Sequence, residues 1–241
     1  MRAADVLAGF RALPELDLAE LVGKRFAVIA PHPDDESLGC GGMIADACQR
    51  WFPPEVVVMT DGAASHPGSR AFPPPVLAAV RQQETRRAME CLGLQPKSLH
   101  FLGLPDGGGS QDPGLLAGAV QRLCAVVARC ETLLVTWRHD PHGDHVAAYL
   151  VARAAADLLG ARLLEYPVWG WTLPDETALP EAGWRGWRVP VASHLAAKRE
   201  AIACHASQHG RVVTDDPFGF VLPPKFLKLF DAGHETLVEA L

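Results

Sequence analysis

Short apolar segments rich in branched side chains alternate along the chain with longer segments of helical periodicity. The apolar segments predict buried strands, because a parallel strand covered on both faces has no need of polar positions. Five strands are expected, at residues 25–30, 55–60, 98–102, 132–137 and 162–166. Helices are expected at about 39–50, 76–92, 113–129, 145–159 and 192–208, with a final helix near the C-terminus.

This alternation predicts βαβ units with right-handed crossovers. The expected fold class is therefore α/β, with a Rossmann-like, mostly parallel sheet covered by helices on both faces in three layers. The 241 residues suit one domain, since α/β folds of roughly 200–250 residues commonly form a single unit. We expect that domain to span residues 1–241, with its core at about 25–210.

The stretch 167–190 is too long for a plain connection and predicts a lid or an interface loop. It holds four of the six tryptophans, at 169, 171, 184 and 187. Their faces suit stacking on a sugar ring or burial in an oligomer interface. Local packing over the core is an equally good interpretation.

Composition and charge narrow the function classes. Hydrophobic residues make up 49% and charged residues 21%, as in ordinary globular proteins. A formal charge of −6 disfavours a nucleic-acid-binding protein, which usually shows a basic surface. The six cysteines form no CxxC pair, which predicts reduced thiols.

The N-terminal segment does not resemble a signal peptide, because Arg11, Glu15 and Asp17 interrupt its apolar run. Nor does any apolar run reach the roughly 18 residues that a membrane span needs. These patterns predict a cytoplasmic protein without a membrane span.

The first candidate motif, PHPDDESLGCGG, occupies residues 31–42 directly after the first expected strand. This is the carboxyl edge of a parallel sheet, where open α/β folds bind their ligands. Two prolines restrict the backbone beside His32 to extended conformations, and the neighbouring Asp34 and Asp35 side chains point to different sides. One carboxylate is then able to bind a metal while the other faces the water on that metal.

The motif has two other possible structural interpretations. It is a plain charged turn if Asp34 or Asp35 only caps the following helix. Gly39, Gly41 and Gly42 permit close backbone approach, but their spacing is not GxGxxG and the adjacent acids would repel a phosphate.

The second motif, RHDPHGDHVAAY, follows the expected strand 132–137 and emerges at the same sheet edge. Asp144 is a good N-cap, which would place His145 in the first helical turn and His142 just before it. The alternative is a surface loop that happens to hold several histidines; His139 has no assigned role.

Together the two motifs predict a three-ligand metal site made of His32, Asp35 and His145. Three protein ligands and an open position are typical of catalytic zinc. Ferrous iron suits the same donors, so the sequence leaves the metal open between Zn²⁺ and Fe²⁺.

The pair of motifs resembles the PIG-L/LmbE-like family of metal-dependent N-deacetylases. That family carries an (A/P)HPDDE segment after its first strand and an HxDH segment later, here PHPDDE and HGDH. The resemblance extends to RQQETRRAMECLGL, FLGLPDGG and KREAIACHASQ, which begin at residues 81, 101 and 198. It covers most of residues 25–210.

The resemblance implies a Rossmann-like fold with one zinc ion held by His32, Asp35 and His145. It implies Asp34 as the general base that activates water. The implied reaction removes an acetyl group from an N-acetylglucosaminyl-type substrate, a small sugar-like molecule.

The resemblance also assigns four residues around that centre. His142 would be the electrophilic partner, oriented by Asp144. Arg81 and Asp106 match family residues that hold the sugar. Family members often assemble, so a homo-oligomer is among the expected states.

Two competing functions remain open on the sequence alone. A metal-dependent hydrolase of another amide or an ester would share every site residue. A non-enzymatic nucleotide- or sugar-binding module would need no metal and no base, and the absent GxGxxG pattern counts against it.

Overall fold

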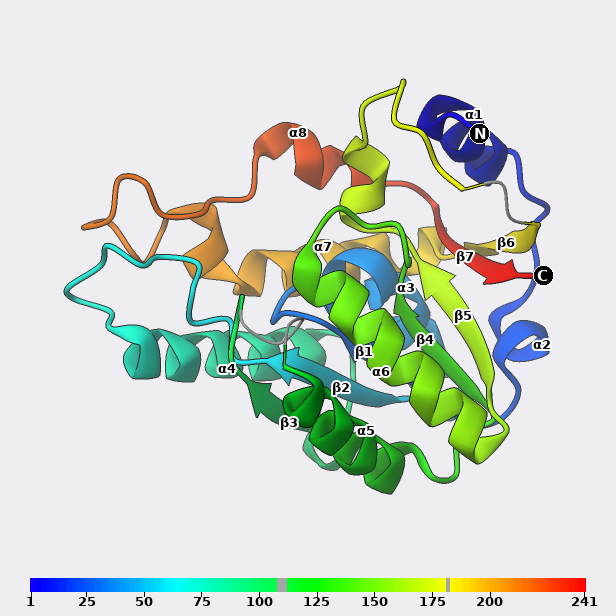
Figure 1. Cartoon of the computed structure of the whole chain (residues 1–241), viewed down its shortest axis with the longest axis horizontal. Helices are drawn as coiled ribbons and strands as arrows, with labels where there is room; N and C mark the ends of the chain where they lie inside the picture. Colours follow the sequence, from blue (N-terminus) through cyan, green and yellow to red (C-terminus); the bar gives the residue numbers. More distant parts are fainter. Residues whose placement is uncertain (108–111, 181–182) are drawn as a thin grey trace.

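The computed structural model describes residues 1–107, 112–180 and 183–241 (Figure 1). Within these residues, one seven-stranded sheet has the order β3-β2-β1-β4-β5-β7-β6. The sheet is built from β1 Phe26–Ala30, β2 Glu55–Thr60, β3 Leu99–Leu104, β4 Thr132–Thr136, β5 Arg162–Tyr166, β6 Trp184–Pro190 and β7 His234–Ala240. Strands β1 to β5 are parallel, and β7 runs antiparallel to both β5 and β6. The predicted α/β fold and its five parallel strands are confirmed.

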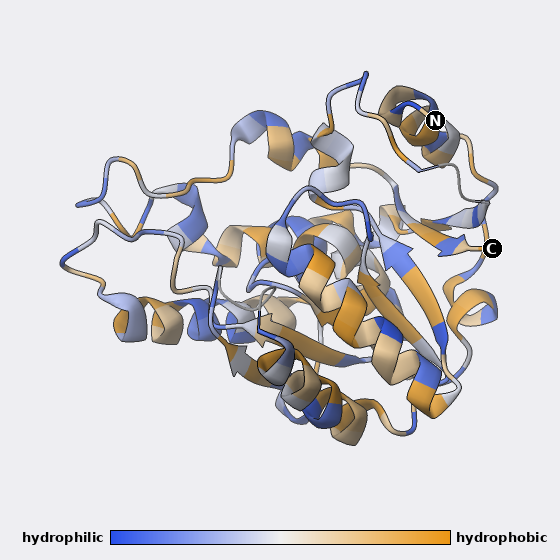
Figure 2. Cartoon of the chain, viewed as in Figure 1, coloured by the Kyte–Doolittle hydropathy of each residue, from blue (hydrophilic) through white to orange (hydrophobic). Residues whose placement is uncertain are grey.

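Helices cover both faces of this sheet. The helices are α1 Ala3–Arg11, α2 Leu18–Val22, α3 Asp35–Gln49, α4 Pro74–Cys91, α5 Pro113–Val127, α6 Gly143–Leu159, α7 Leu195–Cys204 and α8 Pro224–Leu227. Strand β1 shows the division, because its successive side chains point to opposite faces. Phe26, Val28 and Ala30 pack in a cluster with α3 and α4, whereas Ala27 and Ile29 pack in a cluster with α5 and α6. Figure 2 shows the apolar residues along the central strands.

The end of the chain corrects one prediction. The final helix expected near the C-terminus is wrong: after the four-residue α8 and a 3₁₀ turn, the chain ends in β7. The physical reason is non-local pairing. Strand β7 enters the sheet beside β5 and pairs along its length with β6, and these partners lie far from it in sequence.

The tryptophan-rich stretch is also more ordered than a loop. Residues 169–172 form a 3₁₀ turn and residues 184–190 form β6. Trp171 and Trp184 pack edge-on against Phe10 of α1, and Trp187 packs against the core. Local packing is therefore the observed state of these three side chains.

Two further findings bear on the earlier expectations. In the described residues, no helix combines the length and hydropathy needed to cross a membrane. The six cysteines are all free, and the structure brings the sulfur atoms of Cys91 and Cys204 to 3.7 Å from one another.

Helix α3 lies unusually close to the sheet, and Gly39 makes this approach possible. A Cβ atom at Gly39 would lie 2.2 Å from Cδ2 of Tyr166. The Tyr166 ring cannot give way easily, because it is fully buried and its hydroxyl donates to the Ile29 carbonyl at 2.8 Å. The glycine thereby sets the distance between α3 and the end of β5.

We predict that Gly39→Ala destabilises the protein by about 1–3 kcal/mol, the usual cost of overpacking a core. The matched control is Gly118→Ala in α5, where an added Cβ meets nothing within 4 Å and should stabilise by about 0.5–1 kcal/mol. Urea unfolding of both variants measures the difference. Equal effects at the two positions would contradict the role of Gly39.

Candidate metal centre and active site

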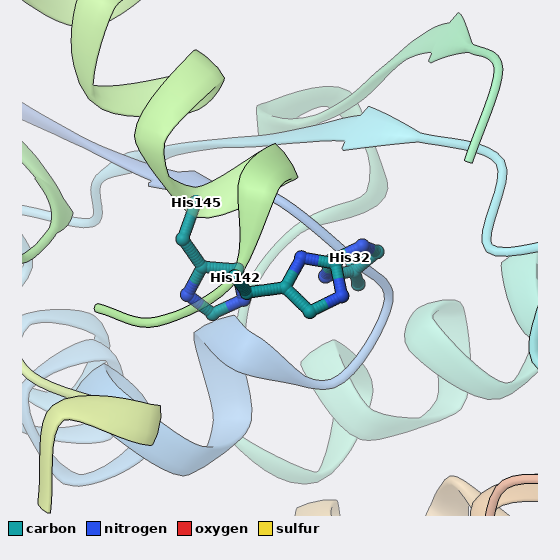
Figure 3. Close-up of side chains that lie close together, drawn as sticks. All are labelled: His32, His142 and His145. Carbon is teal, nitrogen blue, oxygen red and sulfur yellow. The ribbon is translucent and has the colours of Figure 1, made fainter. Parts of the chain in front are cut away.

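The strand order brings the two sequence motifs together. Strands β1 and β4 are neighbours at the point where the strand order reverses, and open α/β sheets bind ligands there, outside the carboxyl ends of the strands. The first motif follows β1 and the second follows β4. Figure 3 shows the result: His32 lies close to His142 and His145 at the start of α6.

Asp35 connects two of these imidazoles. Its Oδ2 atom lies 3.3 Å from His32 Nδ1 and 3.2 Å from His145 Nε2. Two ligand atoms around a tetrahedral metal are separated by about 3.3 Å when each bond is about 2.0–2.1 Å long. The two separations from Asp35 are therefore those expected between ligand atoms around a tetrahedral metal ion.

An orphaned nitrogen strengthens this fit. His145 Nε2 is completely buried and has no hydrogen-bond partner, although its other nitrogen is bonded. A buried polar atom without a partner is costly, and a cation beside Asp35 would satisfy it. Nitrogen atoms of His32, His142 and His145 also lie within 4.8 Å of one another.

Asp140 orients His145, a role that the sequence reasoning missed. Its carboxylate lies 2.9 Å from His145 Nδ1 and accepts three backbone N–H groups from residues 168–170. A carboxylate behind a histidine fixes which imidazole nitrogen remains free for a metal. The signal was present in the second motif, as an acidic residue in the loop that leads to His145.

His32 has a matching arrangement on its second nitrogen. Its Nε2 atom lies 3.1 Å from Asp144 Oδ2 and 3.2 Å from Asp106 Oδ1. Asp144 also accepts the Gly107 N–H at 2.8 Å, and Asp106 accepts the Ala64 N–H at 2.9 Å. Both carboxylates therefore stand behind His32, on the side away from Asp35.

His142 is the N-cap of α6, where the sequence predicted Asp144. Its Nδ1 atom accepts the backbone N–H of Asp144 at 3.2 Å, so Asp144 lies in the first turn. The backbone amide of Asp144, rather than its carboxylate, makes the described hydrogen bond to His142. The imidazole of His142 lies edge-on to that of His32, with ring centroids 4.7 Å apart.

Asp34 has a backbone conformation that only a supported residue adopts. Its φ angle is 144°, a region that costs roughly 1–3 kcal/mol for a residue other than glycine. The side chain makes no capping hydrogen bond to α3, so the capping interpretation of this carboxylate fails. Instead, Oδ2 of Asp34 lies 3.3 Å from Arg81 Nη2.

Glu36 and His205 support the strained backbone at Asp34 through hydrogen bonds. This is a second feature that the sequence did not predict. Glu36 is fully buried, accepts the Asp34 N–H at 3.1 Å and lies 3.2 Å from His205 Nε2. Ser37 lies 3.1 Å from the same nitrogen. His205 is thus a buried, hydrogen-bonded residue.

Arg81 contacts the protein with most of its donor groups. It donates to the carbonyl of Pro33 at 2.6 Å and to that of Gly62 at 3.0 Å, besides its contact with Asp34. Its side chain is only 3% exposed. The structure therefore places Arg81 as the support of the loop that carries Asp34.

A pocket of about 250 Å³ opens above these groups. Its lining includes polar residues, among them Ser65, Gln208 and members of the histidine–aspartate cluster, as well as apolar residues. Its apolar members are Leu38, Trp169, Phe220 and Leu222. Gln208 Oε1 is buried without a hydrogen-bond partner, so it is free to accept from a ligand. Of the predicted residues, the pocket is lined by His32, Asp34, Asp35, Arg81, Asp106 and His142.

The charges in this cluster perturb one another strongly. Burial raises the pKa of Asp34 to about 7, helped by Asp35 and opposed by Arg81. Burial also favours the neutral form of Asp35, but His145 and His32 outweigh it and hold that pKa well below its usual range. The pKa of His145 is raised to about 9, because Asp35 and Asp140 overcome the effect of burial. Such a cluster of perturbed groups beside a pocket is typical of a functional site.

Comparison with known proteins identifies the family. Residues 27–156, which include both motifs, match the PIG-L family model, described as GlcNAc-PI de-N-acetylase. The chain belongs to this family. The resemblance predicted from the sequence is confirmed.

Several proteins similar to this chain are deacetylases by name. The chain is 28% identical over 244 residues to 1D-myo-inositol 2-acetamido-2-deoxy-alpha-D-glucopyranoside deacetylase of Nocardia farcinica, with 75% of this chain and 79% of the relative covered. It is 28% identical over 195 residues to the probable N-acetyl-alpha-D-glucosaminyl L-malate deacetylase 2 of Bacillus anthracis, with 78% and 83% covered. The A40926 pseudoaglycone deacetylase Dbv21 shares the fold, with a TM-score of 0.67, 21% identity and coverage of 90% and 97%.

The contacts of Asp140 lead to a prediction. Asp140→Asn removes the charge behind His145 and should weaken zinc binding by about ten- to a hundredfold, the usual effect of losing such a partner. Asp215→Asn is the matched control, because Asp215 also accepts backbone N–H groups and a serine hydroxyl. Competition with a chromogenic chelator measures both affinities; an unchanged affinity in Asp140→Asn would contradict the assignment.

Proposed function

We propose that the protein is a zinc-dependent N-deacetylase of a small N-acetylated sugar. One observation carries the proposal: the free Nε2 of His145 and the carboxylate of Asp35 converge with His32, at a pocket that Asp34 also lines. Family membership supports the reaction type, and the names of the relatives support the sugar.

His32, Asp35 and His145 are the proposed zinc ligands. Ferrous iron suits the same nitrogen and oxygen donors, and metal analysis of the purified protein distinguishes the two. When bound, the metal lowers the pKa of a water molecule and polarises the acetamide carbonyl.

Asp34 is the proposed general base. Its carboxylate takes a proton from the attacking water and passes it to the nitrogen of the leaving amine. Arg81 holds the Asp34 loop through the Pro33 and Gly62 carbonyls. That contact keeps the base aimed at the pocket.

His142 is the proposed electrophilic partner. With Nδ1 acting as the acceptor, the neutral ring carries its proton on Nε2 and donates it in a hydrogen bond to the carbonyl oxygen as negative charge develops there. The backbone amide of Asp144 holds one ring nitrogen, which leaves the other for the substrate. Burial and the neighbouring His32 and His145 lower the pKa of His142.

The polar wall suits an amino sugar. Asp106 remains the proposed substrate residue, because its carboxylate lines the pocket and is an acceptor for sugar hydroxyls. Gln208 offers a second acceptor through its unpaired Oε1. For Arg81, the contacts favour a positioning role. The free cysteines agree with a reducing, cytoplasmic setting, which we also propose.

Hydrolysis of an ester or of another amide would use the same residues. A panel of N-acetylated sugars, O-acetylated sugars and simple acetamides, assayed for released acetate, separates these activities.

The proposed role of Asp34 as the base leads to a prediction. Asp34→Asn should lower kcat by about 10²–10⁴-fold, the usual contribution of a positioned general base, while zinc content stays near one ion per chain. His145→Ala is the contrasting variant and should lower zinc content as well. Full turnover by zinc-loaded Asp34→Asn would exclude Asp34 as the base.

Removal of the metal yields another prediction. Dialysis against a chelator should abolish acetate release, and added Zn²⁺ should restore it, because the site residues alone do not lower the pKa of water. Bound zinc should also raise the melting temperature, since a ligand that binds only the folded state stabilises it. Turnover that persists in metal-free protein would overturn the proposal.

A further inference from the structure

An exposed apolar loop borders the candidate active site. Phe218 is 95% exposed, Phe220 is 38% exposed and Val221 is 44% exposed. We call these three residues the aromatic rim. Single exposed apolar residues are ordinary, but adjacent ones at the mouth of a pocket indicate a surface that meets an apolar partner.

The rim is held in place by its neighbours. Asp216 accepts the Gly68 N–H at 2.8 Å, and Asp215 accepts the N–H groups of Arg70 and Ala71 at 2.8 and 2.9 Å. The Phe220 N–H donates to the Ser65 carbonyl at 2.7 Å. Figure 1 shows the two loops side by side, the rim loop in orange and the loop before α4 in cyan. The aromatic rings are therefore presented on an anchored segment.

The rim is continuous with the apolar wall of the pocket. Phe220 lines the pocket together with Trp169 and Leu222. Its ring lies edge-on to Trp169, with centroids 5.8 Å apart, and Trp169 stacks on Phe226 at 4.0 Å. Phe220, Trp169 and Phe226 are thus linked by ring contacts, and Phe218 lies two residues before Phe220 in the same exposed loop.

The size of the pocket indicates which part of a substrate lies beside Phe220. At about 250 Å³ the pocket lies below the range of about 300–1,000 Å³ that encloses a drug-sized ligand. This volume accommodates a monosaccharide, so a group attached to the sugar extends toward the mouth. At the mouth it meets Phe220, and Phe218 lies two residues before Phe220 in the same loop.

We propose that the substrate is an N-acetylated amino sugar carrying an apolar aglycone, an aryl or alkyl group, which packs on the aromatic rim. This inference rests on the proposed deacetylase function and specifies its substrate class. A hydroxyl-rich aglycone leaves the rim in water, whereas an aryl or alkyl group removes apolar area from water and gains binding free energy in proportion.

The test compares glycosides of N-acetylglucosamine that differ only in the aglycone. Methyl, phenyl, hexyl and inositol glycosides, in both anomeric forms, are assayed with zinc-loaded protein for released acetate. We expect KM for the phenyl and hexyl compounds to be at least about tenfold lower than for the methyl compound, with kcat little changed. A tenfold ratio corresponds to partial burial of one such group.

Variants tie the preference to the rim. Phe218→Ser removes a side chain that has almost no packing contacts, so this variant should fold normally. Phe218→Ser/Phe220→Ser removes both rings. The preference should shrink in the single variant, while KM for the methyl glycoside stays the same. In the double variant the ratio of the KM values of the phenyl and methyl glycosides should fall to about one, whatever the KM for the methyl glycoside, because Phe220 also lines the pocket. Trp51→Ser is the matched control: this aromatic residue is 92% exposed, lies at the far end of α3, and should leave the preference intact.

The outcomes separate the inference from the proposed function. Deacetylation of the methyl glycoside with equal KM values across the panel overturns the aglycone inference alone. Release of acetate from none of the sugars overturns the proposed function. If the double variant changes only the sedimentation behaviour of the protein, the rim is a contact between copies of the chain and the aglycone inference is wrong.

Discussion

The buried carboxylate of Asp35 is the constraint around which this site is built. A carboxylate taken out of water is costly unless opposite charge and hydrogen bonds compensate it. Here His32 and His145 approach the same oxygen from two sides, at 3.3 and 3.2 Å, and the His32 backbone amide donates to it as well. Two elements distant in sequence must therefore pack together for Asp35 to remain ionised, and a divalent cation suits the space between them.

Further carboxylates extend this arrangement outward. Asp140 stands behind His145, and Asp144 and Asp106 stand behind His32. Each imidazole is thereby fixed in direction by a group that is itself held by backbone amides. Rigid support of this kind is what keeps ligand atoms at the separation a metal needs. The strained φ angle of Asp34 is maintained by two contacts: Glu36 accepts its backbone N–H, and Arg81 contacts its carboxylate.

The pocket combines this polar floor with an apolar side. The motifs that form the polar floor lie within residues 27–156, which match the family model, whereas the wall of Trp169, Phe220 and Leu222 belongs to segments after that range. Segments of this kind are where members of one fold family differ in substrate. The polar cluster of histidines and aspartates and the apolar wall of the pocket therefore have separate structural origins.

The sequence by itself determined the parallel strands, the motifs at their ends and the family, because strand hydrophobicity and motif spacing are local properties. It did not determine strand β7, whose partners are distant in sequence, nor the roles of Asp140, Glu36 and His205. Those roles depend on which side chains meet across β1, β4 and α7, and only the packed sheet decides that. The tertiary structure likewise decided that Trp171, Trp184 and Trp187 pack locally while Trp169 faces the pocket, since burial depends on neighbours that the local pattern does not contain.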